Sequence, residues 1–286
     1  MQWYAGAARE LPWRQPGVDP WAVLVSEVML QQTPVHRVVP AYTAWLQRWP
    51  TPAALAAEPA GEAVRMWGRL GYPRRALRLH ECAVAIVQHH SGHVPAEIEK
   101  LLGLPGVGPY TARAVATFAH GRRHAVVDVN VRRVANRLVR GADDQPPPSG
   151  DQALVGPLVP ADPAQAVRFA AAMMELGALV CTARTPLCRQ CPVAACCAWR
   201  RAGYPAGPAR PSQPYSGTDR QARGRLLAVL RATPDPVRGA DLDAAWPDPR
   251  QRARALASLQ SDRLVERLPG GEFALPGYRI SNMKQP

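Results

Sequence analysis

The chain has 286 residues, enough to bury a large core and to form roughly two or three domains. Its formal charge of +13 and pI of about 10.2 predict a polyanionic partner, most simply nucleic acid, although the near absence of lysine (only Lys100 and Lys284) also fits a GC-rich coding bias. Because no apolar run reaches a membrane span and the N-terminus lacks a signal peptide's hydrophobic region, we expect a cytoplasmic protein with no membrane partner.

The first strongly apolar segment, residues 21–33, has the length of a buried helix. Glu27 lies within it, at helical neighbour spacings from Val23 and Leu24. Burial among such neighbours disfavours the charged form, so we expect a raised pKa for Glu27. On the residues alone, Glu27 is either such an acid or a carboxylate that faces a polar cleft or pairs with an arginine.

A glycine-rich turn then interrupts a series of helical patterns. The patterns are predicted at about 40–49, 52–58, 60–69 and 76–90. Between the last two, the sequence GYPRRA at 71–76 breaks the periodicity. Without further information, Tyr72 in this turn is interpreted as a core ring.

A second glycine turn, LPGVG at 104–108, precedes a helix that starts near Pro109. Two glycines allow positive φ, and the backbone N–H groups of such a turn form an anion site suited to a phosphate. Some twenty residues later, Asp128 stands in an otherwise apolar run before the next helix. On the residues alone the turn is either a simple connection or a phosphate anchor, and Asp128 is either a helix N-cap or a functional carboxylate.

The helix predicted at 129–140 carries an apolar stripe and several arginines. Arg132, Arg133, Arg137 and Arg140 are interpreted either as a solvated face or as a DNA-facing stripe. A proline-rich loop with weak helix follows, and another helix is predicted at about 164–180.

Four cysteines follow with the spacing C-x6-C-x2-C-x5-C, at Cys181, Cys188, Cys191 and Cys197. In a reducing compartment, clustered cysteines indicate a metal site in preference to disulfides. Zinc is the general alternative, but four thiolates in one loop-rich segment can also wrap an iron–sulfur cluster.

After a proline-rich linker at 201–216, the tail predicts a small separate module. Helices are expected at 219–233, 239–246 and 249–260, followed by a hairpin across a Pro-Gly-Gly turn. This pattern suggests a winged-helix-like fold. Arg250, Arg252 and Arg254 on the third helix are either a solvated face or a DNA-binding surface.

Three of these segments resemble a known family. SEVMLQQT at 26–33, LPGVGPYTA at 104–112 and VDVNVRRV at 127–134 are similar to motifs of the endonuclease III superfamily of DNA glycosylases, and most similar to its MutY type, the adenine DNA glycosylases. The cysteine spacing also resembles the [4Fe–4S] loop of these families, which selects Cys197 over the adjacent Cys196. The resemblance is dense over residues 1–200 and hardly extends to the tail.

The resemblance implies a mostly α helix-hairpin-helix glycosylase fold. Its expected parts are a six-helix barrel (15–125), a [4Fe–4S] cluster domain (1–14 with 126–200), the linker (201–216) and an atypical winged-helix-like module (217–278). We expect this module to stand in place of the larger C-terminal domain that usually reads 8-oxoguanine in MutY proteins, which leaves the recognition of that lesion open.

The resemblance also implies roles for individual residues. Glu27 would be the general acid and ionised Asp128 would stabilise the cationic sugar, while Tyr110 and Asn130 would support these two unless they are ordinary helix-start residues. Tyr72 would wedge into the base stack beside an extruded nucleotide. The full set of DNA contacts implied is Gln31, Gln32, Thr33, Tyr72, Leu104, Gly106, Val107 and Gly108.

The implied activity is the hydrolytic removal of adenine mispaired with 8-oxoguanine or guanine in double-stranded DNA, by a monomer at the nucleoid. One alternative is an endonuclease III-type pyrimidine glycosylase and lyase, whose Schiff-base chemistry needs a lysine where this chain has Tyr110. Another is a non-catalytic iron–sulfur DNA-binding sensor, which gives no reason for the pair of Glu27 and Asp128.

Overall fold

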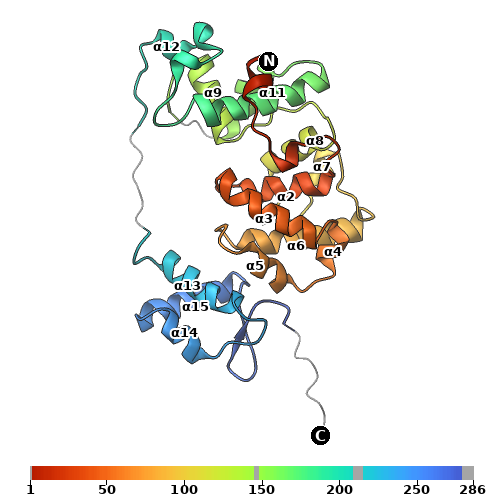
Figure 1. Ribbon diagram of the computed structural model, residues 1–286, viewed down its shortest axis with the longest axis vertical. Coiled ribbons are helices and arrows are strands. Elements are labelled where there is room, and N and C mark those ends of the chain that lie inside the picture. The colour runs from red at the N-terminus through yellow and green to blue at the C-terminus, as the bar shows by residue number, and fades with distance from the viewer. Residues whose placement is uncertain (1, 145–147, 209–214, 279–286) are drawn as a thin grey trace. The chain divides into compact units, whose positions relative to one another are not determined.

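The computed structural model describes residues 2–144, 148–208 and 215–278, and it is mostly α-helical, which confirms the predicted fold class (Figure 1). Contacts divide the chain into two compact units. The first unit comprises Met1–Glu27, Pro95–Gly103 and Val107–Pro211, and the second comprises Val28–Val94, Leu104–Gly106 and Ser212–Pro286. This grouping differs from the domain boundaries expected from the sequence, which stay predictions. The expected linker includes 209–214, which lie outside the described residues.

The first unit is built from short helices that bury clusters of apolar side chains. Its elements are α1 (Gln2–Ala7), η1 (Pro12–Arg14), the start of α2 (Pro20–Leu30), α7 (Ile98–Leu102), α8 (Pro109–Phe118), α9 (Val129–Ala135), η2 (Asn136–Arg140), η3 (Pro148–Gly150), α10 (Asp151–Val155), η4 (Gly156–Leu158), α11 (Pro163–Glu175), η5 (Leu176–Val180), η6 (Cys188–Gln190), η7 (Ala194–Cys196) and α12 (Ala198–Arg201). Both α8 and α11 begin with proline, whose missing N–H is not needed in a first turn.

The predicted helices at 129–140 and 164–180 are both present, each as an α-helix that continues into a π-helical turn. Their apolar residues meet in the core of the unit, where Val131 and Val134 of α9 cluster with Met173 of α11 and Leu176 of η5. The apolar stripe read from the sequence therefore does face the interior.

The second unit contains α3 (Val35–Arg48), α4 (Pro52–Ala56), α5 (Ala60–Trp67) and α6 (Arg74–His89). The four helical patterns are thus confirmed, although α3 begins five residues earlier than expected and includes Pro40. Three fully buried indoles pack edge to face, with ring centroids 4.6 Å apart for Trp45 and Trp49 and 5.7 Å apart for Trp45 and Trp67. Such aromatic packing gives this unit a rigid centre.

The tail belongs to the second unit and forms the predicted three helices and hairpin. These are α13 (Asp219–Arg231), α14 (Gly239–Ala245), α15 (Pro249–Ser261), β1 (Glu266–Arg267) and β2 (Phe273–Ala274). The strands pair antiparallel with Glu266 opposite Ala274, and Val237 adds a bridge to Phe273. Thr218 and Asp248 cap α13 and α15 with side-chain hydrogen bonds, which explains where those helices begin.

None of the helices in the described ranges combines the length and the apolar character needed to cross a bilayer.

Candidate active site and cysteine pocket

Glu27 is a buried acid held by a tyrosine. It lies on α2 with 5% of its surface exposed, and the Tyr110 hydroxyl at the start of α8 donates a hydrogen bond of 2.8 Å to its Oε2. Burial raises the pKa of Glu27 from 4.5 to about 7, against the opposing effect of the Tyr110 hydrogen bond, and the negative charge of Asp128 raises it further. The expectation of a desolvated carboxyl is therefore confirmed.

Asp128 is the N-cap of α9, and both of its carboxyl oxygens are hydrogen-bonded. Its Oδ1 accepts from the Val131 backbone N–H at 2.7 Å, and its Oδ2 accepts from Asn130 Nδ2 at 3.0 Å. Burial raises the pKa of Asp128, while these hydrogen bonds and the charge of Arg133 oppose the rise. Asp128 is thus a cap and a candidate functional carboxylate at once, so the two interpretations were not exclusive.

Arg133 connects Asn130 to the cysteine segment. Its Nη2 donates to Asn130 Oδ1 at 2.8 Å and to the Gly177 carbonyl at 2.6 Å, and its Nε donates to the Cys181 carbonyl at 2.7 Å. Gly177 has no room for a side chain, because a Cβ there would lie 2.7 Å from the Asn130 Cβ. Asn130 is therefore fixed from two sides, and it in turn orients Asp128.

Three residues that the sequence did not single out, Glu175, Arg9 and Arg14, form an ion-pair group whose charge acts on Glu27. Glu175 is fully buried at the end of α11, where Arg9 binds both of its oxygens at 2.8 Å and Arg14 binds Oε1 at 2.7 Å. These arginines lower the pKa of Glu175 against its burial. The positive charge of Arg14 also acts on Glu27 and lowers its pKa. No local pattern could reveal this group, because its members lie more than 160 positions apart.

A pH-dependent stability follows from the raised pKa of Glu27. A carboxyl with a raised folded pKa contributes stability below its unfolded pKa of about 4.5 and loses it as pH rises through about 7, a cost of roughly 3 kcal/mol above that range. We expect Glu27→Gln, which can still accept from Tyr110, to be more stable than the wild type at about pH 8.5 and equal to it near pH 4.

Urea unfolding at several pH values measures this difference, with Glu81→Gln, a change at a partly exposed carboxylate, as a matched control that should stay within about 0.5 kcal/mol at all of them. A Glu27→Gln variant that is no more stable than the wild type at the high pH would show that the carboxyl is not desolvated.

The glycines of the 104–108 turn differ in their physical role. Gly106 has a φ of +79°, and a Cβ there would lie 2.7 Å from the Arg78 Cβ, so the fold requires glycine. Gly108, the N-cap of α8, has φ −95° and ψ 179°, and a Cβ there would meet nothing within 4 Å. Of the two glycines that allow positive φ, only Gly106 uses it, because the backbone of Gly108 is extended.

Neither the backbone conformation nor the packing of Gly108 requires a glycine. A partner that approaches the exposed backbone closely at the N-terminus of α8 would require one. We expect Gly108→Ala to keep the fold and to weaken duplex binding about tenfold, because a Cβ would push a phosphate away from the backbone N–H groups. Gly106→Ala should instead destabilise the protein by about 1–3 kcal/mol. Melting curves and anisotropy titrations measure both, and unchanged DNA binding by Gly108→Ala would contradict the phosphate anchor.

Other expected DNA contacts differ in their exposure. Leu104 and Val107 are buried, which leaves only their backbone groups for a partner. Thr33 is buried too, and its hydroxyl donates to the Leu70 carbonyl at 3.1 Å. Tyr72, in contrast, is 53% exposed with a φ of +46°, so the interpretation as a core ring is wrong. Gln32 is likewise exposed with a φ of +53°.

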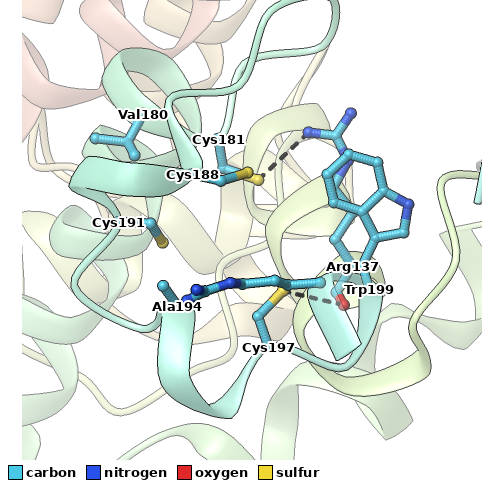
Figure 2. A pocket seen from close by; sticks show the side chains of 9 residues that line it. Arg137, Val180, Cys181, Cys188, Cys191, Ala194, Cys197 and Trp199 are labelled. Atoms are coloured by element: carbon cyan, nitrogen blue, oxygen red, sulfur yellow. Dashed lines mark hydrogen bonds between the residues drawn. The ribbon is translucent and has the colours of Figure 1, made fainter. Parts of the chain in front are cut away.

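The four spaced cysteines line one pocket of the first unit, together with Arg137 and Trp199 (Figure 2). Cys197 lies in this pocket, with its Sγ 3.7 Å from the Arg137 carbonyl. The neighbouring Cys196 is exposed and donates to the Val193 carbonyl at 3.3 Å. Within the described residues, no three His, Cys, Asp or Glu side chains converge closely enough to hold a single metal ion. The four thiols therefore line a pocket but are too far apart to bind one metal ion together.

The arginines predicted as a solvated or DNA-facing stripe are mostly structural. Arg137 is buried, pairs with Asp143 at 2.8 Å, donates to Cys181 Sγ at 3.4 Å and lies 4.4 Å above the Trp199 ring. Arg132 forms a two-pronged pair with Asp151. Both interpretations are therefore wrong for Arg132, Arg133 and Arg137, since helical periodicity does not reveal polar partners from other segments.

Comparisons with known proteins identify the family of this chain. The family model described as HhH-GPD superfamily base excision DNA repair protein matches residues 25–155. An adenine DNA glycosylase of Mycolicibacterium smegmatis is 56% identical over 279 residues, which cover 97% of this chain and 94% of that protein. The chain belongs to the adenine DNA glycosylases of the HhH-GPD superfamily.

More distant relatives match only part of the chain. The adenine DNA glycosylase of Homo sapiens is 45% identical over 212 residues, which cover 70% of this chain and 38% of the human protein. A solved structure of a thermostable thymine-DNA glycosylase aligns with a TM-score of 0.63 and 28% identity over 70% of this chain and 93% of its own. The mycobacterial match, by contrast, extends over most of the tail. The expectation that the resemblance hardly reaches the tail is therefore wrong.

Proposed function

We propose that this chain hydrolyses the N-glycosidic bond of adenine mispaired with 8-oxoguanine or guanine in double-stranded DNA, as a monomer and without lyase activity. Its family membership supports adenine as the base removed. The observation that carries the proposal is the buried Glu27, with a pKa of about 7 and a hydrogen bond from Tyr110, in the same unit as Asp128. Because the bond is inaccessible within the base stack, the nucleotide must first be extruded.

Glu27 would act as the general acid. Adenine is a poor leaving anion, so its departure needs a proton, which Glu27 would deliver to N7. A pKa of about 7 keeps a large fraction of this carboxyl protonated at neutral pH. Since Tyr110 donates to Oε2, Oε1 would carry the acidic proton that is delivered to the base.

Asp128 would stabilise the positive charge that develops on the sugar. The hydrogen bonds from Val131 and Asn130 favour its ionised form, and so does the charge of Arg133. One protonated and one ionised carboxyl correspond to the division of labour in two-carboxylate glycosidases. A lyase would need an amine nucleophile instead, and the Tyr110 hydroxyl cannot form a Schiff base.

The cysteine pocket fits a [4Fe–4S] cluster. Cys181, Cys188, Cys191 and Cys197 would hold it, because these thiols line one space, whereas Cys196 is exposed and does not line it. Arg137 supports the assignment, since its buried guanidinium donates to Cys181 Sγ at 3.4 Å and places a positive charge beside the four thiols. When bound, the cluster would supply a cross-link for the loop and a redox centre.

Base release from a panel of duplexes tests this function. Single-turnover assays should show release from duplexes with A opposite 8-oxoguanine and A opposite G, and none from a thymine glycol duplex. Borohydride should trap little covalent complex. Efficient trapping, or release of thymine glycol in place of adenine, would support the endonuclease III-type alternative, and binding without release of any base would support the sensor.

A further inference from the structure

The backbone turn that presents Tyr72 is held by side chains that donate hydrogen bonds to the carbonyls of the four residues before it, Gly68 to Gly71. The Arg69 carbonyl accepts from Arg37, the Leu70 carbonyl accepts from Thr33, and the Gly71 carbonyl accepts from Trp67 at 2.9 Å and Arg75 at 3.1 Å. The remaining carbonyl, that of Gly68, accepts from a residue of the C-terminal module, as described next. All of these residues belong to the second unit.

Arg231, the last residue of α13, reaches from the module to this turn. Its Nη1 donates to the Gly68 carbonyl at 2.5 Å, and its Nε donates to the Val64 carbonyl at 2.8 Å. Burial lowers the pKa of Arg231 to about 10, so the guanidinium is held in a desolvated place without relief from a carboxylate. Such a costly position indicates that the two hydrogen bonds matter for the structure.

A reciprocal contact fixes the same joint from the other side. Arg65 of α5 donates through Nη1 to the carbonyls of Leu230 at 3.3 Å and Arg231 at 2.9 Å, and also to that of Thr233. Each of the two arginines thus caps the C-terminal end of the other's helix. The Gly61 N–H donates to the Pro276 carbonyl at 2.7 Å, and a Cβ on Gly61 would lie 2.7 Å from that oxygen. The module is therefore docked on α5 at two separate places.

The turn needs such support because its backbone is strained. Gly68, Gly71 and Tyr72 all have positive φ, and for the tyrosine a φ of +46° costs about 1 kcal/mol or more. The Tyr72 side chain is 53% exposed at the tip, where the Arg75 guanidinium lies 5.5 Å from its ring. A strained, exposed aromatic on a turn whose carbonyls from Gly68 to Gly71 all accept hydrogen bonds is suited to press against a base stack.

The module's own arginines give less support to direct DNA binding. On α15, Arg254 pairs with Asp219 at 3.2 Å, and Arg252 pairs with Asp243 at 2.7 Å. Two of the three arginines that could form either a solvated face or a DNA-binding surface are therefore paired with carboxylates of the module itself. A support role explains the module better than a recognition helix does.

We propose that the C-terminal module positions the Tyr72 turn, and that it does so through the hydrogen bonds of Arg231 to the Val64 and Gly68 carbonyls. The inference rests on the proposed function, in which Tyr72 assists extrusion of the adenine nucleotide. The module would thereby promote base extrusion without contacting DNA through α15.

A double-mutant cycle between Arg231→Met and Tyr72→Ala tests the proposal, with single-turnover adenine release from an A:8-oxoguanine duplex as the readout. Arg231→Met should slow release about tenfold with Tyr72 present, and less than about twofold in the Tyr72→Ala background, because the turn would then carry nothing to position. Duplex binding should change little. Arg238→Met is the matched control, since this exposed arginine of the same module pairs only weakly with Asp241, and it should release adenine at the wild-type rate.

Equal slowing in both backgrounds, or no slowing with Tyr72 present, would overturn the proposal. If Arg231→Met fails to fold, Arg231→Lys carries the same cycle, because a lysine can reach one carbonyl but not both; it should show a smaller but still Tyr72-dependent loss. A wild-type protein that releases no adenine would instead overturn the proposed function itself, so the two failures are distinguishable.

Discussion

Replacing Glu27 by Gln or Asp128 by Asn should each reduce adenine release by about 10²–10⁴-fold or more, while binding to the mispaired duplex survives. Both changes keep the shape of the side chain. Glu27→Gln removes the proton that the leaving base needs, and Asp128→Asn removes the charge that stabilises the sugar. Because Gln can accept from Tyr110 and Asn can accept from Val131, the hydrogen bonds that hold the site are kept in part.

Single-turnover rates beside binding curves decide this prediction, with Glu97→Gln as a control on an exposed carboxylate of the same unit. Release by either active-site variant within about tenfold of the wild type would contradict the assignment of that carboxylate, since general acid catalysis is worth more than this. The control should release adenine at the wild-type rate.

Replacing Cys197 by Ser should remove the cluster, whereas Cys196→Ser should keep it. The two residues are adjacent, so each substitution replaces one sulfur atom by oxygen in the same loop. Only Cys197 lines the pocket with Cys181, Cys188 and Cys191, while Cys196 is exposed. We expect the wild type and Cys196→Ser to be brown, with about four irons and four sulfides for each chain, and Cys197→Ser to be colourless or poor in iron.

Iron and sulfide analysis with visible absorption measures this outcome, and melting curves report its effect on the fold. The opposite result, a cluster lost from Cys196→Ser and kept by Cys197→Ser, would show that the register of the ligands is shifted by one. Zinc in place of iron would show that the pocket holds a different metal.

Much of the fold could be predicted because its signals are local. The apolar spacing of α2, the stripe of α9 and the caps of α13 and α15 all lie within single helices. The raised pKa of Glu27 was predictable for the same reason, since its neighbours on the helix are apolar. Family resemblance added what spacing alone could not, namely that Tyr110 and Asn130 lie beside the two carboxylates.

The features that could not be predicted depend on contacts between distant segments. Glu175 gave no signal, because its arginine partners come from the N-terminal segment. Arg133 and Arg137 looked like surface residues in the helical pattern. Both are buried, and they donate hydrogen bonds to backbone carbonyls of the 177–183 segment. The docking of the tail on α5 was equally hidden, since hydrogen bonds to backbone carbonyls leave no trace in the sequence of the acceptor.

The most direct test of the central claim is the detection of the free base itself. The wild-type protein is incubated with a duplex that contains one adenine opposite 8-oxoguanine, and the products are analysed by mass spectrometry. The two-carboxylate mechanism predicts free adenine in equal amount to an abasic site in an uncleaved strand, at a rate that falls as pH rises through about 7 and Glu27 loses its proton. Intact adenine in the duplex after many hours, or a release rate that rises over that pH range, would contradict it.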